Sequence, residues 1–556
     1  MSEQRPWLKN YPTGIPANIN PDAYPTLVAM VEETFKKYKK APAFTCMDKT
    51  LTYEQVDKYS AQFGAYLQSR GLVAGDKIAL MMPNLLQYPI ALFGALRAGL
   101  IIVNTNPLYT PREMHHQFTD AGVKAVIIAE NFAANLQKIL KDTEINTVIL
   151  TSIGEMLGFP KKLIVNFVVR NIKRMVPKFD IPNTVNFTDA LAQGKKFTLK
   201  PLKSSSDDVV ALQYTGGTTG VAKGAMLTNR NLIANMQQNW AWMDPFFEEQ
   251  KEVALCPLPL YHIFAFTVNC LTMMNIGAHS VLITNPRDLN SLIGTMRKYP
   301  ITVMTGVNTL FNALVNHKDF SSLDFSALKV TVGGGMAVQR PVAEKWQKVT
   351  GCFLCEGYGM TEASPVVSTN PLDGTGRIGT IGIPIPSTDV RIVDDAGSVQ
   401  GPGGVGEIQV KGPQVMKGYF NRPEATAKTI VDGWLKTGDI GTMSEDGFFR
   451  IVDRKKDMIL VSGFNVFPNE VEEVVAGHPK VLEVAAVGVP HAKSGEVVKI
   501  FVVKKDSSLT KDELIAYCRE NMTGYKVPKQ VEFRKELPKT NVGKILRRML
   551  RDEAKA

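Results

Sequence analysis

The chain has 556 residues, of which 44% are hydrophobic and 21% are charged, as in ordinary globular proteins. These proportions exclude a disordered or fibrous chain, and the length exceeds what one hydrophobic core usually organises, so we expect several subdomains. The formal net charge of +11 favours anionic partners, either small molecules or a membrane surface.

The first long apolar stretch runs from Ile78 to Val103. Two prolines, Asn84 and Arg97 interrupt it, so we expect a strand, a helix and a strand instead of a membrane span. Residues 1–7 contain no apolar core of the kind that a signal peptide needs. We therefore expect a cytoplasmic protein whose six cysteines are reduced thiols.

A basic amphipathic segment extends from Lys161 to Lys178. It contains six Lys or Arg residues and no acid, while apolar residues such as Leu163, Phe167 and Ile172 recur at helical spacing. One interpretation is an interfacial helix that attaches the protein peripherally to the inner face of the cell membrane. The other is an ordinary amphipathic helix packed on its own domain. The polar face of this helix would carry Lys162, Asn166, Arg170 and Lys173.

The most informative stretch is 214–224, which holds four glycines, three threonines and a lysine. Glycines let backbone N–H groups approach a ligand, threonine hydroxyls add donors and Lys223 adds a charge, so the loop is typical of a phosphate cradle. It is not a Walker A loop, because Lys223 lies between Ala222 and Gly224. We expect a buried strand at 209–212 before it and a helix at 229–239 after it. The predicted phosphate-binding residues are Thr215, Gly216, Gly217, Thr218, Thr219, Gly220 and Lys223.

Two further glycine-rich strings, at 332–336 and 356–365, put bare backbone where a flat base could approach. Tyr358 offers a ring face for stacking, and Glu362 offers a hard carboxylate of the kind that Mg²⁺ takes together with phosphates. The predicted nucleotide-binding residues here are Gly333, Gly334, Gly335, Glu356, Gly357, Tyr358, Gly359 and Thr361.

Between these motifs, prolines stiffen the segment 257–264, which presents Tyr261 and His262. A histidine satisfied inside the core explains His262 as well as a pocket role does. Similarly, Cys352 and Cys355 have redox or zinc spacing, but no second pair accompanies them, so we expect a buried strand there.

Three polar motifs complete the series. The stretch 432–441 carries Asp439, the charge run 453–457 carries Arg454, and the stretch 538–547 near the C-terminus carries Lys544. A carboxylate can accept hydrogen bonds from two hydroxyls, and a guanidinium can bind sugar or phosphate oxygens. The basic tail around Lys544 is alternatively a solvated surface.

The glycine-rich loop and these later motifs, in this order, resemble the adenylate-forming superfamily of acyl-CoA synthetases, luciferases and peptide-synthetase adenylation domains. The span 432–456 and the stretch 104–113 resemble the bacterial long-chain-fatty-acid CoA ligases, although Met443 and Glu445 depart from many members.

The resemblance implies a role for each motif. It makes Lys544, Glu362 and Thr218 catalytic, assigns Mg²⁺ to Glu362 and Thr218, and places Asp439 and Arg454 at the ribose and phosphates. It also puts Tyr261 and His262 beside an acyl pocket. ATP and CoA are then co-substrates, and no nucleic acid is expected.

The resemblance also implies a division of the chain. Residues 1–455 would form a large α/β domain of layered subdomains with a small β-rich part, and residues 456–556 a small mobile α/β domain. Lys456 takes the hinge position, and Ser462 with Gly463 would face CoA. A homodimer is expected at the level of the family.

The reaction implied is two-step: a carboxylic acid and MgATP give acyl-AMP and pyrophosphate, and a thiol then displaces AMP. A long-chain fatty acid is the substrate that the resemblance favours. The alternatives are another acid, aryl or medium-chain, a carrier-protein thiol as acceptor, or a non-catalytic sensor on the same fold. The sensor predicts damaged catalytic positions, whereas Glu362, Asp439 and Lys544 are present.

Overall fold

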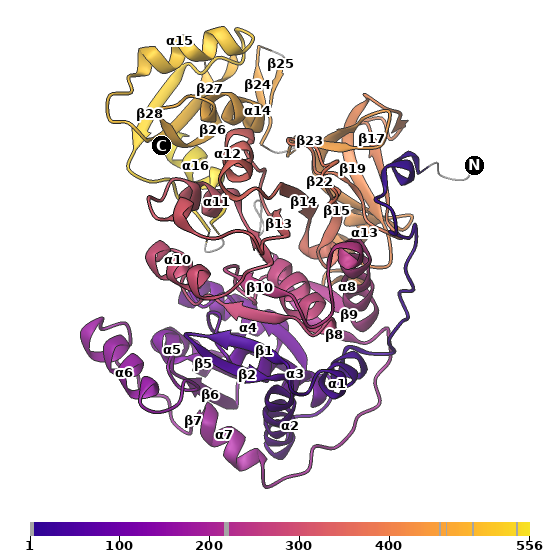
Figure 1. The fold of residues 1–556 in the computed structure, drawn as a ribbon, viewed down its shortest axis with the longest axis vertical. Helices are drawn as coiled ribbons and strands as arrows, with labels where there is room; N and C mark the ends of the chain where they lie inside the picture. Colours follow the sequence, from indigo (N-terminus) through magenta and orange to yellow (C-terminus); the bar gives the residue numbers. More distant parts are fainter. Residues whose placement is uncertain are drawn as a thin grey trace.

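The computed structural model describes residues 5–215, 222–454, 457–462, 464–491, 494–540 and 543–555. It has a large body and a small C-terminal unit, which lies at the top of Figure 1. Within the described residues the strands form four sheets, three in the body and one in the small unit. The predicted layered α/β fold is confirmed.

An eight-stranded sheet forms one layer of the body, with the strand order β20-β9-β8-β4-β3-β5-β6-β7. Its central strands are parallel, and it contains the strand, helix and strand predicted for the apolar stretch at 78–103. The strands are β3 (Lys77–Met81), β4 (Ile101–Asn104), β5 (Val123–Ala129), β6 (Thr147–Thr151), β7 (Val185–Asn186), β8 (Val209–Thr215), β9 (Lys223–Thr228) and β20 (Gly418–Tyr419).

A nine-stranded sheet forms the second layer, in the order β16-β15-β14-β13-β12-β10-β11-β1-β2. The strands from β1 to β14 along this order are paired in parallel. The bounds are β1 (Pro42–Cys46), β2 (Lys49–Thr52), β10 (Val253–Cys256), β11 (His279–Leu282), β12 (Val303–Gly306), β13 (Val330–Gly333), β14 (Leu354–Gly359), β15 (Val366–Thr369) and β16 (Ile383–Pro384).

Helices cover and join these two sheets (Figure 1). The helices α2 and α3 meet at Gly64 and Gly94, where a Cβ atom on either glycine would lie 2.7 Å from a backbone oxygen of the other helix. The close contact therefore depends on the absence of side chains. The helices of the body are α1 (Leu27–Lys37), α2 (Tyr53–Ser69), α3 (Gln87–Arg97), α4 (Pro111–Ala121), α5 (Ala133–Ile139), α7 (Phe187–Gly194), α8 (Asn229–Met243), α10 (Leu289–Lys298), α11 (Asn308–Val315), α12 (Arg340–Thr350) and α13 (Pro423–Thr429).

A third, antiparallel sheet forms the β-rich part of the body and packs its apolar face on Ile383, Ile385 and Trp7. In it, β22 and β23 are neighbours, so Asp439 of the first polar motif lies opposite Arg454 of the second. The strands are β17 (Asp389–Val393), β18 (Val399–Gln400), β19 (Val405–Lys411), β21 (Ile430–Val431), β22 (Trp434–Met443) and β23 (Phe449–Arg454).

The small C-terminal unit has its own sheet and its own core. Its helices α14 (Pro468–Ala476) and α15 (Lys511–Asn521) pack on that sheet, and α16 (Arg547–Lys555) follows the motif at 538–547. The strands are β24 (Ile459–Val461), β25 (Phe464–Val466), β26 (Val481–His491), β27 (Gly495–Lys504) and β28 (Gln530–Arg534).

The basic segment is helical over part of the predicted range: α6 (Lys161–Phe167) continues into one turn of π-helix, η4 (Val168–Ile172), and residues 173–178 lie outside the helix. Figure 1 shows it at the lower left edge of the body. Several of its large apolar residues face solvent, since Leu163 and Phe167 are 60% and 58% exposed, whereas Val165, Val168 and Val169 are partly buried. Over the described ranges, the structure contains no helix with both the length and the apolarity to cross a membrane. All six cysteines are buried and unpaired with each other.

Candidate active site

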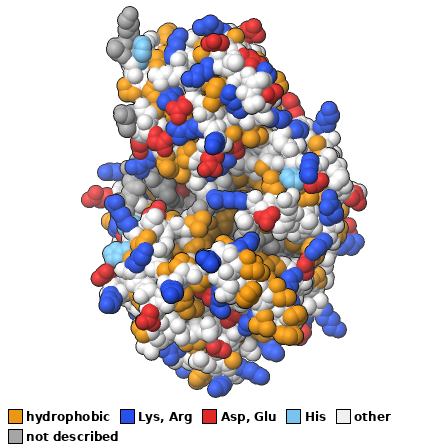
Figure 2. Space-filling model, turned by 90° about the vertical axis from the view of Figure 1, so that its left-hand side faces the viewer, with side chains coloured by type: hydrophobic (Ala, Val, Ile, Leu, Met, Phe, Trp, Pro, Cys, Tyr) orange, Lys and Arg blue, Asp and Glu red, His pale blue; other side chains and the backbone are white. Residues whose placement is uncertain are grey.

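A cavity of about 1530 Å³ lies between the body and the small C-terminal unit, and Figure 2 shows the hollow between them. Its wall combines the carboxyl ends of β8, β13 and β14, the sheet of β22 and β23, and the loop that precedes α16. Because ligands of open α/β sheets bind at the carboxyl ends of the strands, this position is the expected one for a substrate site.

The glycine-rich string after β13 brings backbone close to the cavity. A Cβ on Gly334 would lie 3.0 Å from the Phe264 ring, and Gly335 has a positive φ of 76°. Side chains at these positions would fill the space that the glycines leave open. The predicted residues Thr215, Lys223, Gly357, Gly359 and Thr361 also line the cavity, as do Gly334 and Gly335. Gly333 is buried at the end of β13 beneath them.

The loop residues Gly216, Gly217, Thr218, Thr219 and Gly220 lie outside the described residues. The same holds for Lys456 and Gly463. Their predicted roles stay predictions.

Asp439 and Arg454 face each other across a pair of strands. The register of β22 and β23 places them opposite one another, and Arg454 Nε lies 3.2 Å from Asp439 Oδ1. Tyr358 donates its hydroxyl to Asp439 Oδ2 at 2.7 Å, and burial holds the pKa of this phenol well above its ordinary value. The Asp439 carboxylate is thus fixed from two sides, in a buried position beside the cavity.

Glu362 lies in a short 3₁₀ turn, Thr361–Ala363, directly after β14. Its carboxylate is buried and accepts a hydrogen bond of 2.7 Å from the hydroxyl of Tyr419. The ammonium of Lys223 lies 5.0 Å from the centre of the Tyr419 ring. Tyr419 therefore contacts both the predicted metal ligand and the lysine of the phosphate loop.

Glu356 has a different environment from Glu362, although only five residues separate them. Its carboxyl accepts a hydrogen bond of 3.1 Å from the backbone N–H of Val338, which ties the glycine-rich segment to β14. Burial raises the pKa of Glu356 to about 8. The Glu356 carboxyl is therefore largely protonated at neutral pH. If it contacts the nucleotide as predicted, it does so as a neutral group.

His262 lines the cavity together with Tyr261. Burial, with a smaller contribution from the charge of Lys544, lowers the pKa of His262 to about 4, so the imidazole is neutral at physiological pH. Its Nδ1 accepts a hydrogen bond of 3.3 Å from the Phe264 backbone. His262 therefore lies at the wall of the cavity, and its role beside an acyl group stays a prediction.

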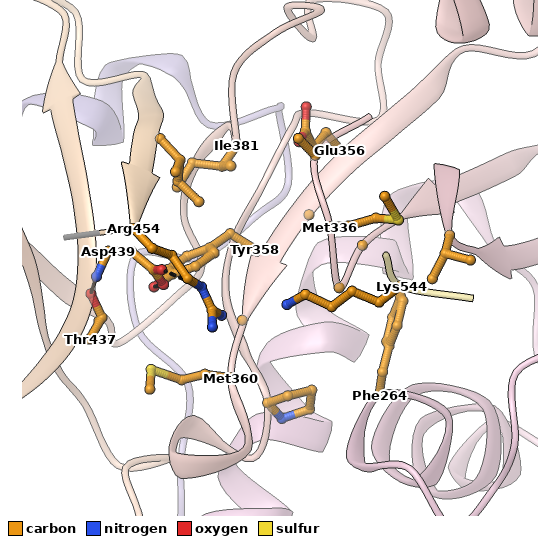
Figure 3. Close-up of a pocket in the computed structure, with 18 of the residues that line it drawn as sticks. Phe264, Met336, Glu356, Tyr358, Met360, Ile381, Thr437, Asp439, Arg454 and Lys544 are labelled. Atoms are coloured by element: carbon orange, nitrogen blue, oxygen red, sulfur yellow. Dashed lines mark hydrogen bonds and ion pairs between the residues drawn. The ribbon is translucent and has the colours of Figure 1, made fainter. Parts of the chain in front are cut away.

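Lys544 enters the cavity from the small C-terminal unit. Figure 3 shows Lys544 and Arg454 pointing toward one another from opposite walls. The preceding Gly543 accepts a hydrogen bond of 3.0 Å from Thr309 Oγ1 of α11, and Asn312 of the same helix donates to the Leu482 carbonyl at 2.8 Å. These contacts dock the small unit in an orientation that places Lys544 opposite the Asp439–Arg454 pair.

Ser462 lies elsewhere. Its backbone N–H donates to the Ser494 carbonyl at 2.8 Å, in the connection between β24 and β25, and it is not part of the cavity wall in the described residues. In this orientation Lys544 lines the cavity and Ser462 does not.

Two contributors to the site have no signal in the sequence. Tyr419 reaches Glu362 across 57 residues of chain, and Thr309 meets Gly543 across 234. Neither belongs to a motif with recognisable spacing. Only the antiparallel strand at 418–419 and the docking of the small unit bring them to the site.

The described residues contain no group of three or more His, Cys, Asp or Glu side chains that could hold a metal ion by themselves. One buried carboxylate, Glu362, lines the same cavity as Lys223 and suits Mg²⁺, which takes one or two carboxylates together with substrate phosphates and water. The residues present therefore fit a magnesium ion that arrives with a nucleotide.

Comparison with known proteins agrees with this geometry. Residues 31–420 match the family described as AMP-binding enzyme, and residues 470–544 match the AMP-binding enzyme C-terminal domain. The chain is 57% identical over 550 residues to a long-chain-fatty-acid CoA ligase of Salmonella typhimurium, covering 99% of this chain and 98% of the relative. It is 39% identical over 559 residues to the enzyme of that name from Bacillus subtilis, covering 100% and 99%.

Two solved structures share the fold. The anthranilate CoA ligase AuaEII in complex with anthranoyl-AMP has a TM-score of 0.86 at 24% identity, covering 96% of this chain and 99% of its own. ATP-bound MatB from Rhodopseudomonas palustris has a TM-score of 0.82 at 26% identity, with coverage of 96% and 99%. The chain belongs to the AMP-binding enzyme family.

Proposed function

We propose that the protein activates long-chain fatty acids in two steps, forming acyl-AMP and pyrophosphate from MgATP and then acyl-CoA and AMP. The observation that carries the proposal is the convergence of Lys544 and the Asp439–Arg454 pair on one cavity that Glu362 also lines. The identity of 57% to a long-chain-fatty-acid CoA ligase over 98% of that relative supports the choice of acid and thiol.

In the first step, an oxygen of the fatty acid carboxylate attacks the α-phosphorus of ATP, and the bond to pyrophosphate breaks. Two anions must approach each other, so a cation between them stabilises charge that grows in the transition state. We assign that role to Lys544, with Arg454 opposite it on the phosphate or ribose side. No proton transfer is required of His262, which is neutral and lies beside the acyl path.

We place the ribose at Asp439, which Tyr358 and Arg454 hold in a fixed position. Tyr419 would keep the Glu362 carboxylate oriented toward the phosphates. Glu362, with Thr218 of the predicted phosphate loop, would hold Mg²⁺, which would act as a Lewis acid and offset the negative charge of the phosphates.

In the second step, the thiolate of CoA attacks the acyl carbonyl and AMP leaves with the bonding electron pair. We propose that residues 456–556 rotate about Lys456 between the steps and bring Ser462 and Gly463 to the thiol. In support, β23 ends at Arg454 in one sheet and β24 begins at Ile459 in another, so few residues need to change conformation.

We also propose that the protein acts in the cytoplasm, attached peripherally to the inner face of the cell membrane. A homodimer remains a prediction of the family resemblance.

The test of the proposed function is product analysis with MgATP, CoA and a panel of acids from acetate through palmitate and oleate to coumarate. We expect AMP and acyl-CoA to form most efficiently with the long-chain acids. Accumulation of acyl-AMP without acyl-CoA would show that the acceptor is not CoA. If none of these acids consumed ATP, the proposed activity would be wrong.

A further inference from the structure

The segment from Phe159 to Met175, which we call the surface helix, comprises α6, η4 and the residues that flank them. Six of its large apolar side chains are exposed to solvent, whereas Val165, Val168 and Val169 are partly buried. The exposed fractions are 87% for Phe159, 60% for Leu163, 59% for Ile164, 58% for Phe167, 65% for Ile172 and 54% for Met175.

Polar side chains hold the opposite face against the body. Asn166 accepts a hydrogen bond of 2.8 Å from the Gly154 N–H and donates one of 2.9 Å to Ser152 Oγ. Arg170 makes a two-pronged ion pair with the buried carboxylate of Glu130, at 2.9 and 2.6 Å. These bonds fix the rotation of the helix about its axis. The exposure of its large apolar side chains therefore follows from specific contacts and does not result from loose packing.

An ordinary surface helix buries its apolar stripe, and contiguous apolar patches on a protein surface usually mark an interaction site. Figure 2 looks onto this side of the molecule, where hydrophobic side chains gather on the lower part of the body. The geometry of the surface helix therefore indicates a partner that covers an apolar ridge.

The charges around the ridge restrict the kind of partner. Lys173, Arg174 and Lys178 are exposed, and the chain contains no acid from Phe159 to Phe179. A second copy of this chain would bring the same positive charges to a two-fold contact, where they would repel. A partner with an apolar interior and negative charge at its surface complements both features.

We propose that the surface helix lies in the interface of an anionic phospholipid bilayer, with Leu163, Ile164 and Phe167 among the acyl chains and the basic residues at the phosphates. The position of α6 at the edge of the molecule, as Figure 1 shows, leaves it accessible to a flat bilayer. This inference specifies which residues make the proposed peripheral attachment. It rests on the proposed function only in one respect: membrane binding would bring the enzyme to the phase in which long-chain acids dissolve.

The test is co-sedimentation of the full chain with vesicles of equimolar phosphatidylglycerol and phosphatidylcholine, without ATP or fatty acid, so that vesicle binding is measured separately from activity. We expect the triple variant Leu163→Ser, Ile164→Ser, Phe167→Ser to bind at least about tenfold more weakly than the native chain. Val399→Ser is the control for replacing an exposed apolar residue elsewhere, because Val399 is 60% exposed and lies on β18, outside the surface helix. Retained melting temperature and retained activity in detergent show that the triple variant is folded.

A second variant separates the charges from the exposed apolar side chains. Lys173→Gln with Arg174→Gln should weaken binding by about tenfold at low salt and much less at high salt, since the attraction to an anionic surface is screened. Arg170 is left intact, because it is the partner of Glu130 and its replacement would disturb the anchor.

Two results would overturn the proposal: the native chain fails to bind anionic vesicles, or the triple variant binds them as the native chain does. If the triple variant keeps vesicle binding and also loses self-association in sedimentation equilibrium, the exposed apolar residues belong to contacts between copies of the chain.

Discussion

The two walls of the active-site cavity are built in different ways. On the body, Asp439 and Glu362 are buried, and Tyr358, Arg454 and Tyr419 bind their carboxylates with tightly spaced contacts. On the small unit, Lys544 reaches the cavity from a loop whose position depends on docking, through contacts such as that of Gly543 with Thr309. The positions of the site residues on the body are fixed by its own fold. The position of Lys544 depends on how the small unit docks on the body.

This difference teaches how one cavity can serve two reactions. In the proposed mechanism, the nucleotide needs the same ribose and phosphate contacts in both steps, and the fixed wall would provide them. The cation would be needed where acid and phosphate meet, and the thiol would later need the same space. A group held only by docking can leave without unfolding the site.

The largest expected effect comes from removing the docked cation. Lys544→Ala should slow acyl-AMP formation by about 100- to 1000-fold, since a positioned charge at the developing transition state is lost. Conversion of supplied acyl-AMP to acyl-CoA should be nearly unchanged. Pyrophosphate release and thioester formation are measured separately. Lys535→Ala, at an exposed lysine of the same unit, is the control, and equal losses in both steps would contradict the division of roles.

A smaller effect should follow from disturbing the docking itself. Gly543 has a φ of 84°, and a Cβ there would lie 2.8 Å from Thr309 Oγ1. Gly543→Ala should therefore slow acyl-AMP formation by about tenfold, because the left-handed backbone alone costs an alanine about 1–2 kcal/mol. Single-turnover kinetics measure it.

Gly524→Ala is the control for this variant, since Gly524 lies in the same unit with nothing within 4 Å of the added Cβ. If Gly543→Ala lowered only the melting temperature and left the adenylation rate intact, the docking contact would have no part in catalysis.

The smallest effect concerns the stability of the fixed wall. Glu356 has its pKa raised by burial to about 8 from an ordinary 4.5, so the folded state binds more protons than the unfolded state between these values. Its contribution to stability is complete below about pH 4.5 and is lost as the pH rises to about 8. Glu356→Gln should remove this pH-dependent loss of stability. The difference in melting temperature between pH 4.5 and pH 8 should become smaller by about 2–4 °C.

Calorimetry at both pH values measures the effect, with Glu344→Gln on the exposed face of α12 as the control. An unchanged difference in the Glu356→Gln variant would mean that Glu356 is ionised in the folded protein.

Much of the molecule follows from the sequence alone. The strand, helix and strand at 78–103, the buried strand before the phosphate loop and the helix after it agree with the structure. So does the layered α/β class. Local periodicity and turn residues carry this information, because burying a strand or a helix stripe imposes its pattern on neighbouring residues. The motifs also put Asp439, Arg454 and Lys544 among the site residues, and the structure brings all three to one cavity.

The sequence predicted an amphipathic helix over 161–178, and the structure is helical over 161–172, but only the tertiary structure decided which face is outward. A periodic pattern defines two faces and says nothing of what each one meets. Here Glu130 and Ser152, distant from the pattern, bind the polar face and turn the apolar face to solvent. Likewise, Tyr419 reaches Glu362 and Thr309 reaches Gly543 only through folding. Contacts between segments far apart in the chain depend on geometry that no local pattern records.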